Sequence, residues 1–125
     1  MKALFFTREF PPYVYGGAGV HVEYLADELS KLMKVDVRSF GDQDENQPNL
    51  NVKGFPYENA LFNDSDSKLK AVFQTLSTNL QMNAEAIDAD VVHCHTWYAH
   101  FAGIVAKLCY GVPLVITTHS LEPLR

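Results

Sequence analysis

The sequence has 125 residues, of which 47% are hydrophobic and 20% charged, with 7 Gly, 6 Pro and 2 Cys. These values exclude a collagen-like chain, a small disulfide scaffold and a disordered chain, and the length predicts one domain. The 10 basic and 15 acidic residues give a net charge of −5, and residues 42–66, here called the acidic segment, account for all of it. Because no basic face is left for a phosphate backbone, the composition argues against nucleic-acid binding.

The cysteines and the apolar segments favour a protein of the cytoplasm. Cys94 and Cys109 are too far apart for a C-x-x-C pair, so we expect two buried thiols in a reducing compartment. The apolar run near the N-terminus is short, and no stretch is long enough to cross a bilayer. We therefore expect a cytoplasmic protein with no membrane span.

Buried strands and one amphipathic helix are expected in the first half of the chain. Residues 3–6 are continuously apolar and predict a fully buried strand, which leads into a Pro- and Gly-rich loop at 11–19. Residues 22–33 have apolar side chains at helical spacing, and residues 35–40 alternate as in a strand. The acidic segment is expected to be mostly loop, with one possible short strand near 52–55.

Two helices and two strands are expected in the second half. An amphipathic helix is predicted over 67–87, a buried strand over 90–94, an almost wholly apolar helix over 97–110 and a final strand over 114–118. The candidate N-caps of the first of these helices are Ser65, Asp66 and Ser67. Its predicted buried face consists of Leu69, Val72, Phe73, Leu76, Leu80, Asn83 and Ile87. The alternation of strands and helices predicts an α/β fold, an open doubly wound parallel sheet of the Rossmann-like type with about five strands.

Polar residues gather beyond the carboxyl ends of the predicted strands, where ligands bind in such a fold. They are Glu9 and Gly16–Gly19 after the first strand, His93, His95, Trp97 and Tyr98 around the fourth, and His119 after the fifth. The glycine segment precedes a helix, where backbone N–H groups and the helix dipole attract a phosphate; a flexible turn is the alternative. A dinucleotide-binding fingerprint fits less well, because its last glycine is missing and its first glycine does not follow the strand directly.

The histidines allow two interpretations. His93 and His95 would point to one face of a strand and, with Cys94, His100 and His119, could form a metal site. No carboxylate follows at ligand-like spacing, however, and buried strands often end in a satisfied polar residue, so we expect no metal. His119 is the better candidate for ligand binding. A nucleophilic triad lacks support because the sequence has no G-x-S-x-G elbow.

Three segments together resemble one group of enzymes. They read F-P-P-Y-V-Y-G-G-A-G-V-H-V-E-Y-L-A-D-E-L (residues 10–29), D-V-V-H-C-H-T-W-Y-A (90–99) and P-L-V-I-T-T-H-S-L-E-P-L (113–124). In this order they resemble the N-terminal domain of GT-B glycosyltransferases of the glycogen and starch synthase group, particularly the ADP-glucose type. The resemblance implies a retaining hexosyltransferase that moves glucose from ADP-glucose or UDP-glucose to an α-1,4-glucan such as glycogen, without a cofactor.

The resemblance also implies a role for each matching residue. Gly16 and Gly17 match a glycine pair whose backbone amides face the donor diphosphate. His119 matches a histidine that lies against the transferred sugar, which makes it the catalytic candidate. Glu9 and His95 match residues on the substrate-binding wall of the cleft, and the position of Tyr98 is expected on the same wall.

Two positions differ from the starch-synthase pattern, which has lysine in place of Val14 and a second histidine in place of Tyr98, and this leaves the nucleotide sugar open. In that family a C-terminal domain binds the donor, so residues 1–125 are expected to be the N-terminal, acceptor-side domain and to be inactive alone. The strand around 114–116 is then an exposed edge, and we expect self-association. The alternatives are a non-catalytic binding or regulatory module with the same fold and a His-rich metal-dependent hydrolase.

Overall fold

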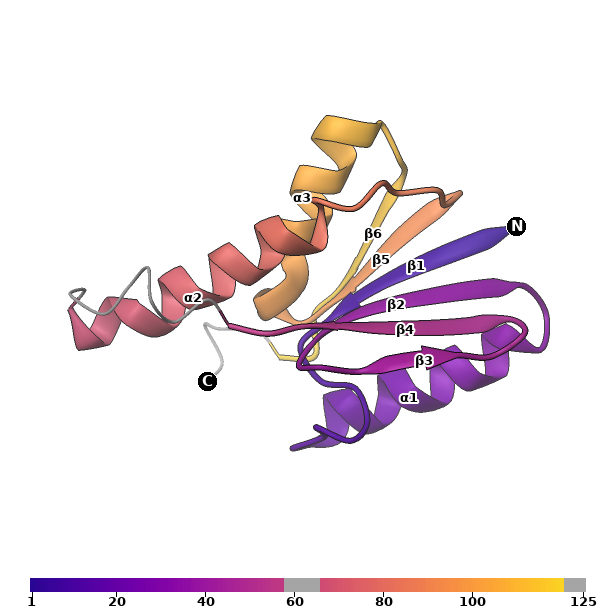
Figure 1. The fold of residues 1–125 in the computed structure, drawn as a ribbon, viewed down its shortest axis with the longest axis horizontal. Coiled ribbons are helices and arrows are strands. Elements are labelled where there is room, and N and C mark those ends of the chain that lie inside the picture. Colours follow the sequence, from indigo (N-terminus) through magenta and orange to yellow (C-terminus); the bar gives the residue numbers. More distant parts are fainter. Residues whose placement is uncertain (58–65, 121–125) are drawn as a thin grey trace.

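The computed structural model describes residues 1–57 and 66–120, which form one sheet with helices on both faces (Figure 1). The strands are β1 (Lys2–Thr7), β2 (Lys34–Phe40), β3 (Asp44–Asn46), β4 (Leu50–Phe55), β5 (Val91–His95) and β6 (Leu114–Thr117), and the helices are α1 (Gly17–Ser30), α2 (Ser67–Met82) and α3 (Trp97–Tyr110). The strand order is β3-β4-β2-β1-β5-β6, and every pair is parallel except β3 with β4. The predicted Rossmann-like α/β sheet is therefore confirmed.

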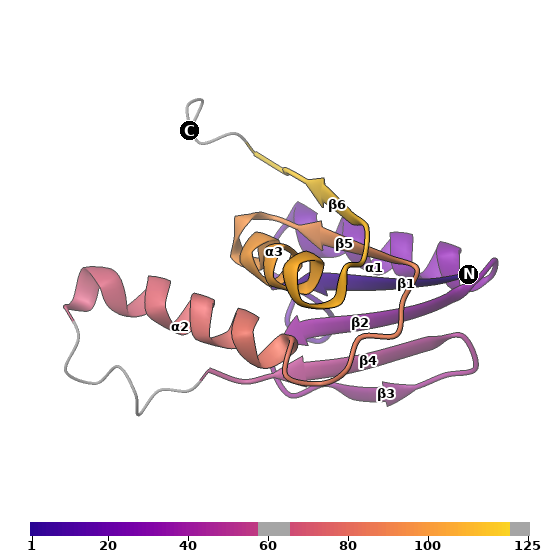
Figure 2. The ribbon, with the colours of Figure 1, turned by 90° about the horizontal axis from the view of Figure 1, so that it is seen from above.

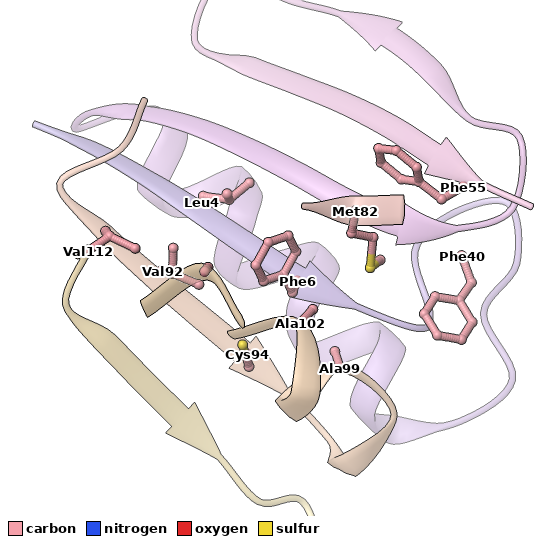
Figure 3. Packing of buried hydrophobic residues seen from close by; sticks show 11 residues of the cluster. Leu4, Phe6, Phe40, Phe55, Met82, Val92, Cys94, Ala99, Ala102 and Val112 are labelled. Carbon is pink, nitrogen blue, oxygen red and sulfur yellow. The ribbon is translucent and has the colours of Figure 1, made fainter. Parts of the chain in front are cut away.

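Alternate residues of β1 build the two apolar layers of the core. Phe5 packs in the layer under α1, together with Val22 of that helix. Leu4 and Phe6 point to the opposite face and pack with Met82 of α2 (Figure 3). Figure 2 shows α1 on one side of the sheet and α3 on the other. A strand that is buried on both faces requires the continuous apolar run that predicted it.

Small residues let α3 approach the sheet closely. The buried residues of this helix are Ala99, Ala102, Gly103 and Ala106. A Cβ added to Gly103 would overlap Cys94 Sγ of β5 and come within 2.6 Å of Leu114 Cδ1 of β6. The helix ends at the predicted stop signal, where Gly111 takes a left-handed φ of 68°.

The acidic segment contains more strand than the sequence predicted. Residues 44–46 form β3, residues 50–55 form a longer β4, and the two pair as an antiparallel hairpin, so the sheet has six strands rather than about five. The apolar residues of β4 are buried and most of its polar residues are exposed, which is a strand alternation that the sequence reading passed over. Exposed Asp44 and Glu45 of β3 protect this sheet edge from pairing with other chains.

Helix α2 differs from the prediction in its length and in the face that it buries. It ends at Met82 rather than at residue 87, and Asp66 is its N-cap, accepting a hydrogen bond from the Lys68 N–H at 2.8 Å. Its buried residues are Thr75, Thr78, Asn79 and Met82. Four residues predicted to face the core are exposed instead, namely Leu69, Val72, Phe73 and Leu80. The polar face can be buried because its side chains bond to backbone carbonyls.

The Asn79 carboxamide joins α2 to α3. Its Nδ2 donates to the Tyr98 carbonyl at 2.7 Å, and its Oδ1 accepts from the Ala102 N–H at 2.7 Å. In an uninterrupted helix these two backbone groups would bond to each other, so the amide is inserted into the first turn of α3. Asn83 makes a second link by donating to the Ala102 carbonyl at 3.0 Å. A buried polar contact thus fixes the start of α3.

The other differences from the prediction are small. Helix α1 starts earlier than predicted, at Gly17, and ends at Ser30, which leaves Leu32 exposed. Both cysteines are free, but only Cys94 is buried, whereas Cys109 is exposed, contrary to expectation. In the described ranges no helix combines the length and the apolar character that a bilayer crossing requires.

Candidate functional site

The predicted site residues lie where β1, β5 and β6 end and α1 begins. The strand register places Thr7 of β1 opposite His95 of β5, and His95 opposite Thr117 of β6. Glu9 and His119 each follow this row by two residues, so they leave the sheet at the same edge. The fold therefore brings together residues that are more than 100 positions apart in the sequence.

His95 is the most buried of the predicted site residues, with no exposed surface. Its Nδ1 lies 3.3 Å from His119 Nε2, and its Nε2 has no hydrogen-bond partner in the part of the chain that the structure describes. Burial, followed by the charges of the surrounding histidines, lowers the pKa of His95 to about 3. The imidazole is therefore neutral at physiological pH.

His119 lies at the open side of the same cluster and is exposed. Its ring centroid is 5.5 Å from that of His95 and 5.3 Å from that of His21, an exposed residue of α1. Burial and the charge of His21 lower the pKa of His119, and the negative charge of Glu9 opposes this shift. Sequence reasoning did not single out His21; its place one turn into the helix after the glycines was the available signal.

His93 and His100 bond to Thr117 of the neighbouring strand. His93 Nε2 lies 2.6 Å from Thr117 Oγ1, and His100 Nε2 lies 3.3 Å from the Thr117 carbonyl oxygen. Both side chains therefore hold β6 against the rest of the sheet. Within residues 1–57 and 66–120, no three histidine, cysteine or carboxylate side chains are placed to hold a metal ion.

Glu9 fixes the loop that leads to the glycines. Its carboxylate accepts a hydrogen bond from the Tyr15 N–H at 2.5 Å, which closes the loop back onto the end of β1. A Cβ added to Gly19 would lie 2.9 Å from Glu9 Cβ and 2.9 Å from Val14 Cγ1, so this glycine allows the loop to pack on α1. Glu9 thus orients the loop, in addition to its predicted place on the cleft wall.

Gly16 and Gly17 form the open N-terminus of α1. Gly16 is the N-cap and Gly17 the first helical residue, and a Cβ added to either would have no atom within 4 Å. Packing therefore does not require glycine at these two positions. The backbone N–H groups of a first helical turn lack helical acceptors, so this exposed turn can receive an anion.

Tyr98 lies against Arg8. The Arg8 guanidinium carbon lies 4.2 Å from the Tyr98 ring centroid and 5.9 Å from that of Tyr15, and Trp97 stacks on Tyr98 with centroids 4.2 Å apart. Thr96, which connects β5 to this turn, has a φ of 66°, a strained value for a β-branched residue. The structure therefore places Tyr98 beside Arg8, at the carboxyl end of β1.

A pocket of about 400 Å³ opens where β1, β2 and β4 end. It is lined by Arg8, Tyr13, Tyr15, Phe40, Gly41, Asp42, Phe55, Pro56 and Tyr57. Tyr13 Oη donates to Asp42 Oδ1 at 2.6 Å, and this bond with the Asp42 charge raises the pKa of Tyr13. Sequence reasoning missed this pocket because its aromatic residues come from separate segments and resemble core residues. We call it the aromatic pocket.

Comparison with known proteins gives one consistent result. A family model described as Glycosyltransferase Family 4 matches residues 15–125. The α-maltose-1-phosphate synthase of Mycolicibacterium smegmatis is 45% identical over 128 residues, which cover 100% of this chain and 30% of that protein. An uncharacterized glycosyltransferase of Methanocaldococcus jannaschii is 30% identical over 98% of this chain and 32% of its own length. The glycogen synthase of Mycobacterium tuberculosis is 27% identical, again over 98% of this chain and 34% of its own length.

Proposed function

Because this chain belongs to glycosyltransferase family 4, we propose that it forms the acceptor-side domain of an enzyme that transfers glucose from a nucleotide sugar to a sugar acceptor. The observation that carries the proposal is the family match over 15–125, which includes the first turn of α1, the whole of β5 and the segment after β6. The chain spans about 30% of the length of the relatives named first. We propose that the donor-binding half of the active site belongs to a second domain, and that residues 1–125 are inactive without it.

The reaction joins C1 of glucose to an acceptor hydroxyl oxygen and breaks the bond from C1 to the donor diphosphate. The electron pair of the broken bond leaves with the nucleoside diphosphate, which also takes the acceptor's proton. Negative charge therefore develops on the diphosphate, and groups that stabilise it accelerate the step. We assign this role to the backbone amides at Gly16 and Gly17, because they lie in an exposed helical turn with open space around them.

We assign His119 to the transferred sugar and make it the catalytic candidate. It is exposed, and it is joined to the buried ring of His95. A neutral His95 can orient His119 without adding a positive charge beside it. Glu9 positions the glycine turn through Tyr15, and Tyr98 belongs to the acceptor side.

Two acceptor classes follow from the relatives. The name glycogen synthase points to an α-1,4-glucan, which is the acceptor that the resemblance also implied. The name α-maltose-1-phosphate synthase points to a phosphorylated product, and that product is glucose 1-phosphate with one more glucosyl unit. We propose ADP-glucose or UDP-glucose as the donor, no cofactor and a cytoplasmic location.

Release of nucleoside diphosphate tests the proposal, with the longest natural polypeptide that contains this chain. ADP-glucose and UDP-glucose are each offered with glycogen and with glucose 1-phosphate. We expect turnover with at least one pair and a loss of about 100-fold or more in kcat for His119→Ala. His100→Gln is the matched control, because His100 bonds to a backbone carbonyl of β6 and should leave kcat within about twofold. A folded protein that binds a donor but releases no diphosphate would support the binding-module alternative instead.

A further inference from the structure

We propose that Arg8 makes the aromatic pocket select a hexose phosphate over a neutral sugar, by binding the phosphate monoester. The inference rests on the proposed function, because it takes the aromatic pocket as the acceptor subsite of that transferase. It adds a specificity-determining residue that lies outside the histidine cluster, which consists of His21, His93, His95 and His119. Arg8 immediately precedes Glu9, so one short segment connects the aromatic pocket with the loop that leads to the glycines.

The walls of the aromatic pocket suit a sugar ring. Five of the nine described residues that line it are Tyr or Phe, and the flat faces of such side chains pack against the C–H faces of a hexose. The size of about 400 Å³ lies in the range of small-molecule sites. Gly41, with a φ of 129°, keeps one wall open, since a Cβ there would lie 2.8 Å from the Tyr13 ring. The pocket is thus shaped by its strand ends.

Among the residues that the structure describes, Arg8 is the only cation that lines the pocket. In residues 1–57 and 66–120 no carboxylate forms an ion pair with it; the ion pairs found there involve Lys2, Lys31 and Lys53. Its guanidinium is held instead by the rings of Tyr98 and Tyr15. Ring contacts fix the plane of the guanidinium but leave its N–H donors free, and this fork matches two phosphate oxygens.

A second charged residue in the pocket determines the orientation of a bound ligand. Asp42 lines it as well, and its Oδ1 accepts the Tyr13 hydroxyl. Its other oxygen can accept from sugar hydroxyls, while the same negative charge repels a phosphate. A hexose phosphate would therefore place its hydroxyls toward Asp42 and its phosphate toward Arg8. A neutral glucan could accept a hydrogen bond from Arg8 but would lack the charge attraction that a phosphate gains there.

The pocket also shares a structural element with the proposed donor side. Tyr15 lines the pocket with its side chain and donates its backbone N–H to Glu9. The next residues are the glycines at the start of α1. A ligand that packs on Tyr15 is therefore in contact with the loop that we assign to the diphosphate.

Binding measurements test the inference without any need for turnover. The probes are glucose 1-phosphate, glucose 6-phosphate, glucose, maltotetraose and inorganic phosphate, titrated into the longest natural polypeptide that contains this chain. For Arg8→Gln we expect the Kd of at least one hexose phosphate to rise about 10- to 100-fold, the range for a lost hydrogen bond to a charged group. We expect Arg8→Lys to retain part of this affinity. The Kd for the neutral sugars and the Kd for the nucleotide sugar should change less than about twofold.

Two controls separate the possible failures. Lys34→Gln removes an exposed positive charge at the opposite end of β2 and should leave every Kd unchanged. Thermal unfolding shows whether Arg8→Gln is folded. An equal loss for neutral and phosphorylated sugars, an effect on the nucleotide sugar alone, or no hexose phosphate binding by the unmodified protein would overturn the inference. Failure to release diphosphate, with selective hexose phosphate binding lost in Arg8→Gln, would overturn the proposed function and leave the assignment of Arg8 standing.

Discussion

The histidine cluster and the aromatic pocket both lie at the carboxyl edge of the sheet, and they differ in electrostatic character. In the histidine cluster at the ends of β5 and β6, burial lowers the pKa values of His93, His95 and His119, and His95, with a pKa of about 3, is neutral at physiological pH. The aromatic pocket at the ends of β1, β2 and β4 contains a permanent cation, Arg8, and an anion, Asp42. A neutral cluster can lie against a reacting sugar without attracting stray ions, whereas a charged pocket can select ligands by charge. The loop from Arg8 to Gly17 separates the two.

The largest effect is expected from a charge added on the donor side of this loop. Gly17→Asp places a carboxylate in the open first turn of α1, where we propose that the diphosphate binds. Like-charge repulsion should lower kcat/KM for the nucleotide sugar by about 100-fold or more. The free energy of unfolding should stay within about 1 kcal/mol, because an acidic residue is favourable at a helix N-terminus.

Gly17→Ala is the matched control for that substitution, since it adds a Cβ without charge and meets no neighbouring atom. Kinetics with varied donor concentration, together with urea unfolding, separate the two effects. Equal kinetics for Gly17→Asp and the unmodified protein would remove the glycine turn from the donor site. Binding of glucose 1-phosphate to the aromatic pocket should be the same in all three proteins.

The pH dependence of the free energy of unfolding should distinguish the two clusters, because it should arise at the histidine cluster and not at Arg8 of the aromatic pocket. The folded pKa of His95, about 3, lies below the ordinary value of 6.5 for histidine, so the unfolded chain takes up the proton first. Stability is therefore full above about pH 6.5 and falls as the pH drops toward 3, by up to about 1.4 kcal/mol for each pH unit. The charges of the four surrounding histidines, His93, His119, His21 and His100, lower the pKa of His95 further.

Urea unfolding at several pH values between 7 and 4 measures this dependence. His95→Gln should flatten the curve, because one group that resists protonation is gone. Arg8→Gln is the matched control and should retain the full slope, since arginine does not titrate in this range. Parallel curves for His95→Gln and the unmodified protein would show that His95 is not held neutral by its surroundings.

The two clusters also differ in how far the sequence predicted them. Glu9, His95 and His119 follow predicted strands, and the parallel register alone was enough to bring them to one edge. The aromatic pocket depends on the β3–β4 hairpin, of which the sequence predicted only one possible short strand near 52–55, so the hairpin wall had no predicted position. Local patterns cannot show which of several aromatic residues will be left partly uncovered.

Helix α2 shows the same limit within the fold. Its apolar spacing predicted a buried face through Leu69, Val72 and Leu80, but the structure buries the face that carries Asn79. The reason is a tertiary bond, the Asn79 amide inserted between the Tyr98 carbonyl and the Ala102 N–H. Periodicity measures only the average preference of a face for water, and one well-satisfied polar contact with another helix can override it.

The smallest expected effect concerns the strand edge beside the histidine cluster. Strand β6 ends the sheet order, and its Val115 and Ile116 are 46% and 45% exposed. We propose that the 125-residue chain alone self-associates through this strand, whereas the other edge is protected by the charges of β3. The double substitution Val115→Thr, Ile116→Thr keeps the β-branched shape and removes apolar area, so the association constant should fall about 10-fold. Light scattering over a concentration series measures it, and Glu45→Gln on β3 is the matched edge control. A monomer at every concentration, or an equal response to both changes, would contradict association through β6 and leave the assignment of the two clusters untouched.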